Sequence, residues 1–276
     1  MIKKLLLIII VLAIGNNNFA QTKADSTGEA LQKIALAIQS DTIIPNRFKL
    51  DSLVTRNLIQ TLKFPNSFSF KFDSLNAIQH IEAPDHSFKL FCWQLDLGDG
   101  TYRQRAAMQF PTVDGTLKLL PFFDNSDFIE EPTKGITDRK KWMGAIYYDI
   151  ILTENNNQKY YTLLGFDEQN LTTSRKIIEV IHFENNEPVF GGDYFSYPSD
   201  DTYPTAPIDR FVYTYKKGSN AFIRYEPENK HLVLSELAST ENNLKLSSTL
   251  VPSGNEVFFV WKNGKWTMTP AKPNKK

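Results

Sequence analysis

The chain has almost no sulfur with which to stabilise itself covalently. Its 276 residues include a single cysteine, Cys92, so no disulfide can form within the chain. Cys92 alternates with Phe88 and Leu90 in a strand-like run, and this pattern predicts a buried, inert thiol. Stability must therefore come from packing, for which 20 phenylalanines, 11 tyrosines and 4 tryptophans supply the apolar area.

The common catalytic and cofactor-binding signatures are also missing. The sequence contains no G-x-S-x-G or S-x-x-K motif of serine acyl enzymes, and no P-loop or G-x-G-x-x-G motif for nucleotides. Its four histidines show no H-E-x-x-H or comparable spacing of metal ligands; they are His80, His86, His182 and His231. We therefore predict no cofactor and no metal site, and the sequence favours a protein without enzymatic activity.

Charge of either sign is not in excess. The chain has 31 basic and 31 acidic residues, and removal of a leader that holds Lys3 and Lys4 leaves 29 basic residues, a formal balance of −2. A surface of this kind gives no electrostatic reason to bind nucleic acid or anionic lipid. Outside residues 5–14 no run is apolar enough to enter a bilayer, so we predict no integral membrane segment.

The first twenty residues have the organisation of a secretory signal peptide. Lys3 and Lys4 precede an apolar run of ten residues, 5–14, and a short polar stretch ends at Ala20. A run of ten residues is too short for a membrane-spanning helix, so cleavage before Gln21 is favoured over a permanent anchor. We expect an exported protein, located in the periplasm or outside the cell.

Two amphipathic helices are predicted in an N-terminal helical segment, residues 21–65. Ser26 and Glu29 have the spacing of a capping box, and apolar residues follow it at helical spacing: Leu31, Ile34, Ala35 and Ile38. After Pro45 a second helical face is marked by Leu50, Leu53, Val54, Leu58 and Leu62. Pro65 is expected to end this second helix.

From Ser67 onward the apolar period changes to two, which predicts an antiparallel β domain at residues 66–270 and a polar tail at 271–276. Asn263-Gly264 is the strongest hairpin signal, and it places Trp261 opposite Trp266. The predicted strands are 67–72, 77–83, 88–97, 101–110, 116–122, 145–153, 159–166, 176–183, 188–190, 211–216, 221–226, 231–237, 244–250, 256–262 and 265–269.

The arrangement of these strands predicts a mainly β fold. Twelve of them form three groups of four, beginning near residues 77, 143 and 210, with linkers at 123–142 and 191–209. Each group has the pattern of an antiparallel meander, which is the blade unit of a propeller. If the final hairpin and the strand at 67–72 complete a fourth blade, the fold is a small β-propeller of about four blades. An extended β-sandwich or barrel is the alternative.

The two linkers carry the candidate ligand-binding residues and are expected to converge. Carboxylates beside aromatic faces suit a hydroxyl-rich ligand such as a glycan. Calcium is a weaker alternative because no D-x-D-x-D-G run occurs, and a polar surface loop without a ligand is the third. The candidates are Asp124, Asp127, Trp142, Asp193, Tyr194, Tyr197, Asp200, Asp201 and Tyr203.

These features predict an exported, non-catalytic protein that binds a ligand or partner outside the cytoplasm, such as a glycan or an envelope protein. One alternative is a glycan-directed hydrolase with paired carboxylates from the 123–142 and 191–209 linkers. Another is a structural component of an envelope assembly, which a broad exposed apolar patch would indicate. Glycoside hydrolysis requires two carboxyl groups at a defined separation, and sequence spacing assigns no catalytic residue here.

Several short motifs occur together along the chain. They are Asn66-Ser67-Phe68, Phe72-Asp73-Ser74-Leu75, Phe88-Lys89-Leu90-Phe91 with Trp93, and Tyr160-Tyr161-Thr162-Leu163-Leu164-Gly165. In these motifs the chain resembles a family of exported, β-rich bacterial proteins with no assigned activity. The resemblance implies export and a shared β body, and it implies no activity.

Overall fold

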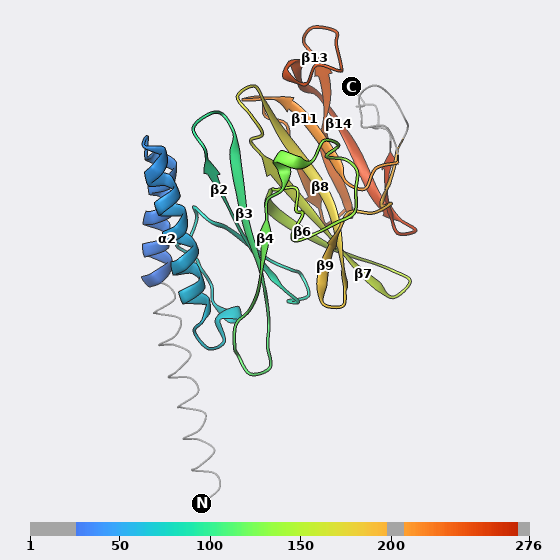
Figure 1. The fold of residues 1–276 in the computed structure, drawn as a ribbon. Helices are drawn as coiled ribbons and strands as arrows, with labels where there is room; N and C mark the ends of the chain where they lie inside the picture. Colours follow the sequence, from blue (N-terminus) through green and yellow to red (C-terminus); the bar gives the residue numbers. More distant parts are fainter. Residues whose placement is uncertain (1–25, 198–206, 270–276) are drawn as a thin grey trace, which may run out of the picture. The chain divides into compact units, whose positions relative to one another are not determined.

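The computed structural model describes residues 26–197 and 207–269, which form mainly β-structure with two helices near the N-terminus (Figure 1). The predicted mainly β, antiparallel fold opened by two short helices is thereby confirmed. The signal-peptide prediction for residues 1–20 and the polar tail at 271–276 lie outside the described residues. No helix in the described part of the chain has both the length and the apolar character needed to cross a bilayer.

The chain divides into two compact units. One takes in the chain up to Gln79 together with Gln109–Leu119. The other takes in His80–Met108 and the chain from Leu120 onward. Within the described residues, the linker candidates from the sequence all belong to the second unit.

The first unit contains the two helices. Residues 26–40 are helical, and α2 (Ile44–Leu62) follows after three residues. Pro45 lies in the first turn of α2, where its missing N–H has no intrahelical partner to lose. Val54, Leu58 and Leu62 are buried on the predicted face of α2, whereas Leu53, which the pattern also placed on that face, is exposed.

The predicted strand at 67–72 is wrong. A single 3₁₀ turn, η1 (Ser67–Ser69), occupies its first half, and it follows Asn66 in the left-handed conformation with φ of 58°. Phe70 and Phe72 are nevertheless buried, so their alternation reflects burial beside a turn rather than a pleated strand. The segment adds no strand to a fourth blade.

The remaining strands form three sheets. The four-stranded sheet has the order β1 (Gln79–Glu82), β2 (Lys89–Asp96), β3 (Tyr102–Phe110), β4 (Lys118–Phe123). The six-stranded sheet has the order β5 (Thr137–Asp138), β9 (Glu187–Phe190), β8 (Thr173–Glu184), β7 (Gln158–Asp167), β6 (Ile146–Asn155), with β11 (Phe211–Lys216) also paired to β8. The five-stranded sheet has the order β10 (Phe195–Ser196), β15 (Lys265–Thr269), β14 (Leu250–Lys262), β13 (His231–Ser239), β12 (Ile223–Glu226).

The first two predicted meanders are confirmed as β1 to β4 and β6 to β9. The third differs, because β11 pairs antiparallel with β8 and leaves the group to which the sequence assigned it. The predicted strand at 244–250 is also wrong: a loop with the 3₁₀ turn η3 (Ser247–Thr249) occupies it, and β14 begins at Leu250. A propeller is not confirmed by these pairings.

Within the second unit the six-stranded sheet has a partner on each face. Its Leu164, Ile178 and Val180 share one apolar cluster with Leu232 and Phe259 of the five-stranded sheet. On the opposite face Phe88 lies edge-on to Tyr161, with ring centroids 5.0 Å apart, and Phe122 of β4 lies edge-on to Phe190 at 5.3 Å. This layering corresponds to the sandwich alternative, and it buries both faces of β8.

Candidate functional site

Asp124 and Trp142, the first linker candidates, are committed to contacts within the fold. They form an isolated parallel β-bridge with each other. The Asp124 carboxylate accepts the Gln104 N–H at 2.6 Å and the Ser126 N–H at 2.9 Å. Trp142 is fully buried and donates its indole N–H to the Tyr147 hydroxyl at 2.9 Å. Neither side chain presents a free face to a ligand.

Asp127 and Asp193 are exposed and lie beside basic side chains. Asp127, in the 3₁₀ turn η2 (Ser126–Phe128), is 3.7 Å from Arg103, and Asp193 is paired with Lys265. Exposed pairs of this kind contribute little to stability. The two carboxylates therefore stay exposed to solvent, each beside one basic side chain.

The linker tyrosines have different environments. Tyr197 packs edge-on against Phe211 of the core at 5.6 Å, and burial raises the pKa of its hydroxyl. The Tyr194 hydroxyl is 3.2 Å from Nδ1 of His182, and burial first, then the nearby Tyr160, raise its pKa to about 12. The remaining candidates, Asp200, Asp201 and Tyr203, lie outside the described residues.

Tyr194 belongs to a group of aromatic rings on the last hairpin and its neighbours. The Tyr160 ring lies 5.3 Å from Tyr194 and 5.8 Å from Trp261. Trp261 is paired with Trp266, as the hairpin signal predicts, with ring centroids 5.4 Å apart. Trp266 is fully buried and donates its indole N–H to Thr162 at 2.8 Å. These contacts favour a structural role, in which the tryptophans pack the last hairpin against its neighbours, over a ligand-binding role.

The two linkers do meet, but through residues that the sequence did not select. The Asp209 N–H donates to the Thr133 carbonyl at 2.9 Å, and its carboxylate accepts the Gly135 N–H at 2.7 Å. Arg210, fully buried, donates to the carbonyls of Lys134 at 3.1 Å and Gly135 at 2.9 Å. The junction is a structural contact in which the Arg210 side chain is buried.

A concave site lies elsewhere in the second unit. Its volume is about 320 Å³, and its walls come from the β7–β8 loop, from β11 and from the loop before β14. Residues that carry side-chain hydroxyls line it from all three elements: Thr172, Thr173, Thr214, Ser247 and Ser248. We call it the hydroxyl pocket.

The β7–β8 loop wall is fixed by Asn170. Its side-chain oxygen accepts the N–H groups of Thr172 and Thr173, both at 2.9 Å, which sets the orientation of the amide. The hydroxyls of the same two threonines also reach this oxygen, at 3.1 and 3.0 Å. The side-chain amide N–H groups of Asn170 are consequently the part left for another partner.

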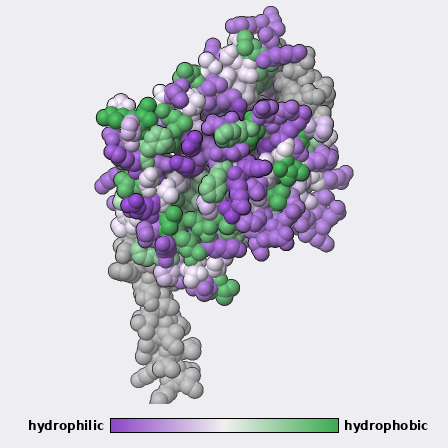
Figure 2. All heavy atoms as spheres, in the orientation of Figure 1, coloured by the Kyte–Doolittle hydropathy of each residue, from purple (hydrophilic) through white to green (hydrophobic). Residues whose placement is uncertain are grey.

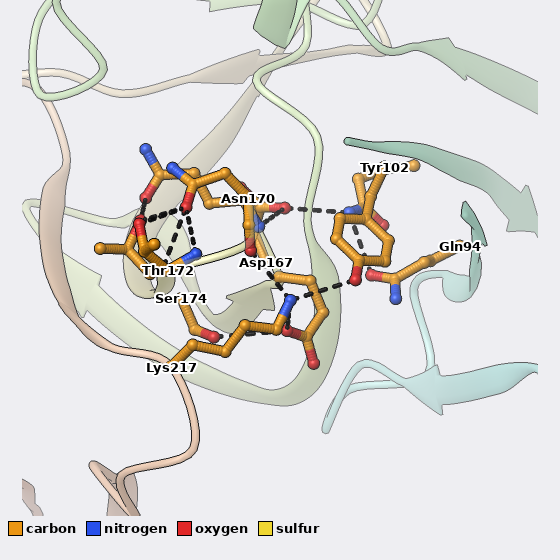
Figure 3. Close-up of polar contacts among 11 residues, drawn as sticks. Gln94, Tyr102, Asp167, Asn170, Thr172, Ser174 and Lys217 are labelled. Carbon is orange, nitrogen blue, oxygen red and sulfur yellow. Dashed lines mark hydrogen bonds and ion pairs between the residues drawn. The ribbon is translucent and has the colours of Figure 1, made fainter. Parts of the chain in front are cut away.

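A polar network supports the same loop (Figure 3). Lys217 donates to the Asn170 carbonyl at 2.9 Å and to the Tyr102 hydroxyl at 3.1 Å, and its ammonium lies 2.8 Å from the Glu168 carboxylate. Ser174 donates to the same carboxylate at 3.3 Å. The loop that lines the hydroxyl pocket is therefore held from several directions.

Asp167 lies at the base of this network. It accepts from the Gln104 side-chain amide at 3.0 Å and lies 3.7 Å from Arg175. Burial raises the pKa of the Asp167 carboxyl, and its hydrogen bonds and Arg175 oppose that effect. Because Gln104 also donates to Asp124, the first linker is connected to this network.

The first unit offers a different kind of surface. Figure 2 shows apolar surface gathered over the end of the helical pair where the two helices join. Four large apolar side chains are exposed there: Leu36, Ile43, Ile44 and Phe48. An apolar patch of this kind is typical of protein contact surfaces.

Among the described residues no group of three or more His, Cys, Asp or Glu is placed to hold a metal ion. Comparison of the chain with family models, with curated proteins and with solved structures finds no match. The resemblance to exported β-rich proteins therefore stays a prediction.

Proposed function

We propose that this chain is an exported, non-catalytic binding protein whose hydroxyl-rich ligand occupies the hydroxyl pocket. The observation that carries the proposal is that five residues with side-chain hydroxyls line one concave site of about 320 Å³. Pockets for small molecules begin at about 300 Å³. Hydroxyls both donate and accept hydrogen bonds, so they match the mixed donors and acceptors of a sugar.

Hydrogen bonds within the loop before β14 order this wall of the pocket, and this order supports the proposal. Thr249 is buried, and its N–H donates to the Leu246 carbonyl at 2.9 Å. The Lys245 N–H donates to the Asn243 side chain at 3.1 Å, and the Asn243 N–H donates to Ser239 at 2.9 Å. A wall that is already ordered loses less conformational entropy when a ligand binds.

The same observations favour binding over the alternative of glycan hydrolysis. The lining of the hydroxyl pocket contains no Asp or Glu, whereas hydrolysis needs two carboxyl groups beside the scissile bond. Both oxygens of the Asp124 carboxylate accept backbone N–H groups. Asp127 and Asp193 are exposed beside basic residues, so burial desolvates neither carboxyl.

The test is a thermal-shift and calorimetric titration of the mature chain with a panel of mono- and oligosaccharides. A ligand at 100 times its Kd stabilises the protein by about 2.7 kcal/mol. Thr214→Val removes one lining hydroxyl and should weaken binding roughly tenfold, the loss of about one hydrogen bond. Thr267→Val on β15 makes the same change outside the pocket and should leave affinity unchanged. The proposal is wrong if no saccharide in the panel raises the melting temperature or gives a measurable heat of binding.

A further inference from the structure

We infer that the ligand of the hydroxyl pocket is an anionic sugar, a monosaccharide-sized molecule bearing a carboxylate or phosphate group that Lys245 binds. This inference rests on the proposed function. It follows from the charges that line the pocket, from the direction of its hydrogen bonds and from its size.

The charge of the pocket lining is positive. Lys245 is its single ionisable residue, and it is exposed, with no ion pair among the described residues. Glu168 precedes the lining residue Gln169 in the chain, but the Glu168 carboxylate is already paired with Lys217 at 2.8 Å. Asp167 is buried behind the loop and bonded to Gln104. An uncompensated ammonium group in a concave site favours an anion.

The hydrogen bonds divide the pocket into two sides. On the β7–β8 side, the hydroxyls of Thr172 and Thr173 point at Asn170, so they offer lone pairs to the hydroxyl groups of a ligand. On the opposite side, Ser247 and Ser248 follow Lys245 after one intervening residue, and their hydroxyls can donate hydrogen bonds. Donors next to a cation suit the oxygens of a carboxylate or phosphate. The acceptor side suits the sugar ring and the donor side suits its charged group.

The size of the pocket suits a small molecule better than a bare ion. A volume of about 320 Å³ lies at the low end for small-molecule pockets. The pocket volume is roughly ten times the volume that one water molecule occupies in the liquid. An inorganic oxyanion would leave much of it unfilled. One sugar unit with its charged substituent fits these limits.

The experiment is a calorimetric titration of the mature chain with glucuronate, glucose 6-phosphate and glucose as probes. The wild-type protein should bind at least one of the two anions tenfold or more tightly than glucose, and this preference should fall as ionic strength rises. Lys245→Gln should weaken anion binding about tenfold and leave glucose binding unchanged. Lys262→Gln, at the end of β14, removes the same charge elsewhere and should change neither.

The outcomes distinguish the two proposals. If glucose binds as tightly as both anions, or if Lys245→Gln and Lys262→Gln weaken anion binding equally, the pocket is not an anion site, although the proposed function survives. If none of the three probes binds, this inference fails, and if the saccharide panel also gives no binding, the proposed function fails with it. Retained folding of both variants is checked by their melting temperatures.

Discussion

The Arg210 guanidinium donates its Nε–H to the Glu179 carboxylate at 2.6 Å, and both side chains are buried. Glu179 also accepts the hydroxyl proton of Tyr147, while Arg210 donates to the backbone carbonyls of Lys134 and Gly135. The pair thus joins β8 to the first linker and to the residue that follows the second. A charge at this depth is tolerated only because its partner and these carbonyls satisfy it.

Removal of either partner should therefore be severe. We expect Arg210→Met and Glu179→Leu each to lower the free energy of unfolding by about 3–5 kcal/mol, because each leaves an uncompensated buried charge. The double variant should lose less than the sum of the two single variants. Urea denaturation measures all three.

The control for this cycle is Arg224→Met on β12. Arg224 pairs with Glu226 and Glu256 at the surface, at 2.9 and 3.0 Å, and its loss should cost about 1 kcal/mol or less. Additive effects of the Arg210 and Glu179 substitutions would contradict the coupling of the buried pair.

Asp85 should make the protein acid-sensitive. Burial raises the pKa of its carboxyl, but hydrogen bonds from Lys159, Ser87 and Tyr161 outweigh burial and lower the pKa from 3.8 to about 2. Because the folded pKa is depressed, the stabilisation is complete above the unfolded pKa and is lost as the pH falls from about 4 through about 2. The shift corresponds to roughly 2 kcal/mol.

We therefore expect Asp85→Asn to lower the free energy of unfolding by roughly 2 kcal/mol at pH 7 and by progressively less below pH 4. Urea titrations at a series of pH values measure this difference. Asp193→Asn is the control, since that side chain is 68% exposed in its pair with Lys265 and should have little effect. A deficit for Asp85→Asn that is constant with pH would rule out the linkage.

The Asp124 carboxylate lies so close to Gly144 that no larger side chain fits at this position. A Cβ atom at Gly144 would lie 2.7 Å from Asp124 Oδ1, and φ at this glycine is +79°. Two backbone N–H groups hold the Asp124 carboxylate, so it cannot move away without losing them. We expect Gly144→Ala to lower the free energy of unfolding by about 2–3 kcal/mol.

Gly218→Ala is a matched control for this substitution. Gly218 has nearly the same backbone conformation, with φ of +81°, but nothing lies within 4 Å of its added Cβ. Its substitution should cost only the left-handed backbone strain, about 1–2 kcal/mol. Equal losses for the two variants, measured by thermal or urea unfolding, would show that the contact with Asp124 is unimportant.

Cys92 should be inert in the folded protein. Its side chain is 1% exposed, and burial raises the pKa of the thiol to about 12, so almost no thiolate is present at neutral pH. A thiol reagent such as dithionitrobenzoate should label the native chain hundreds of times more slowly than the chain in denaturant. Rapid native labelling of one equivalent would contradict the buried position.

The hydroxyl pocket could not be predicted from the sequence. Its residues belong to three distant segments, and Thr172, Thr214 and Ser248 are ordinary polar residues in each. The prediction instead selected linkers rich in carboxylates and aromatic rings. Trp142 is buried in the interior, because large aromatic side chains stabilise most when they are removed from water.

The sequence by itself determined the helical pair, most strand positions and the register of the last hairpin. These features are local: Asn263 and Gly264 adopt φ of 50° and 78°, a two-residue turn that fixes Trp261 opposite Trp266. The tertiary structure decided that β11 pairs with β8, that 67–72 forms a turn, and which loops enclose the pocket. Period and turn chemistry act between near neighbours, whereas strand partners and pockets depend on which distant apolar faces are buried together.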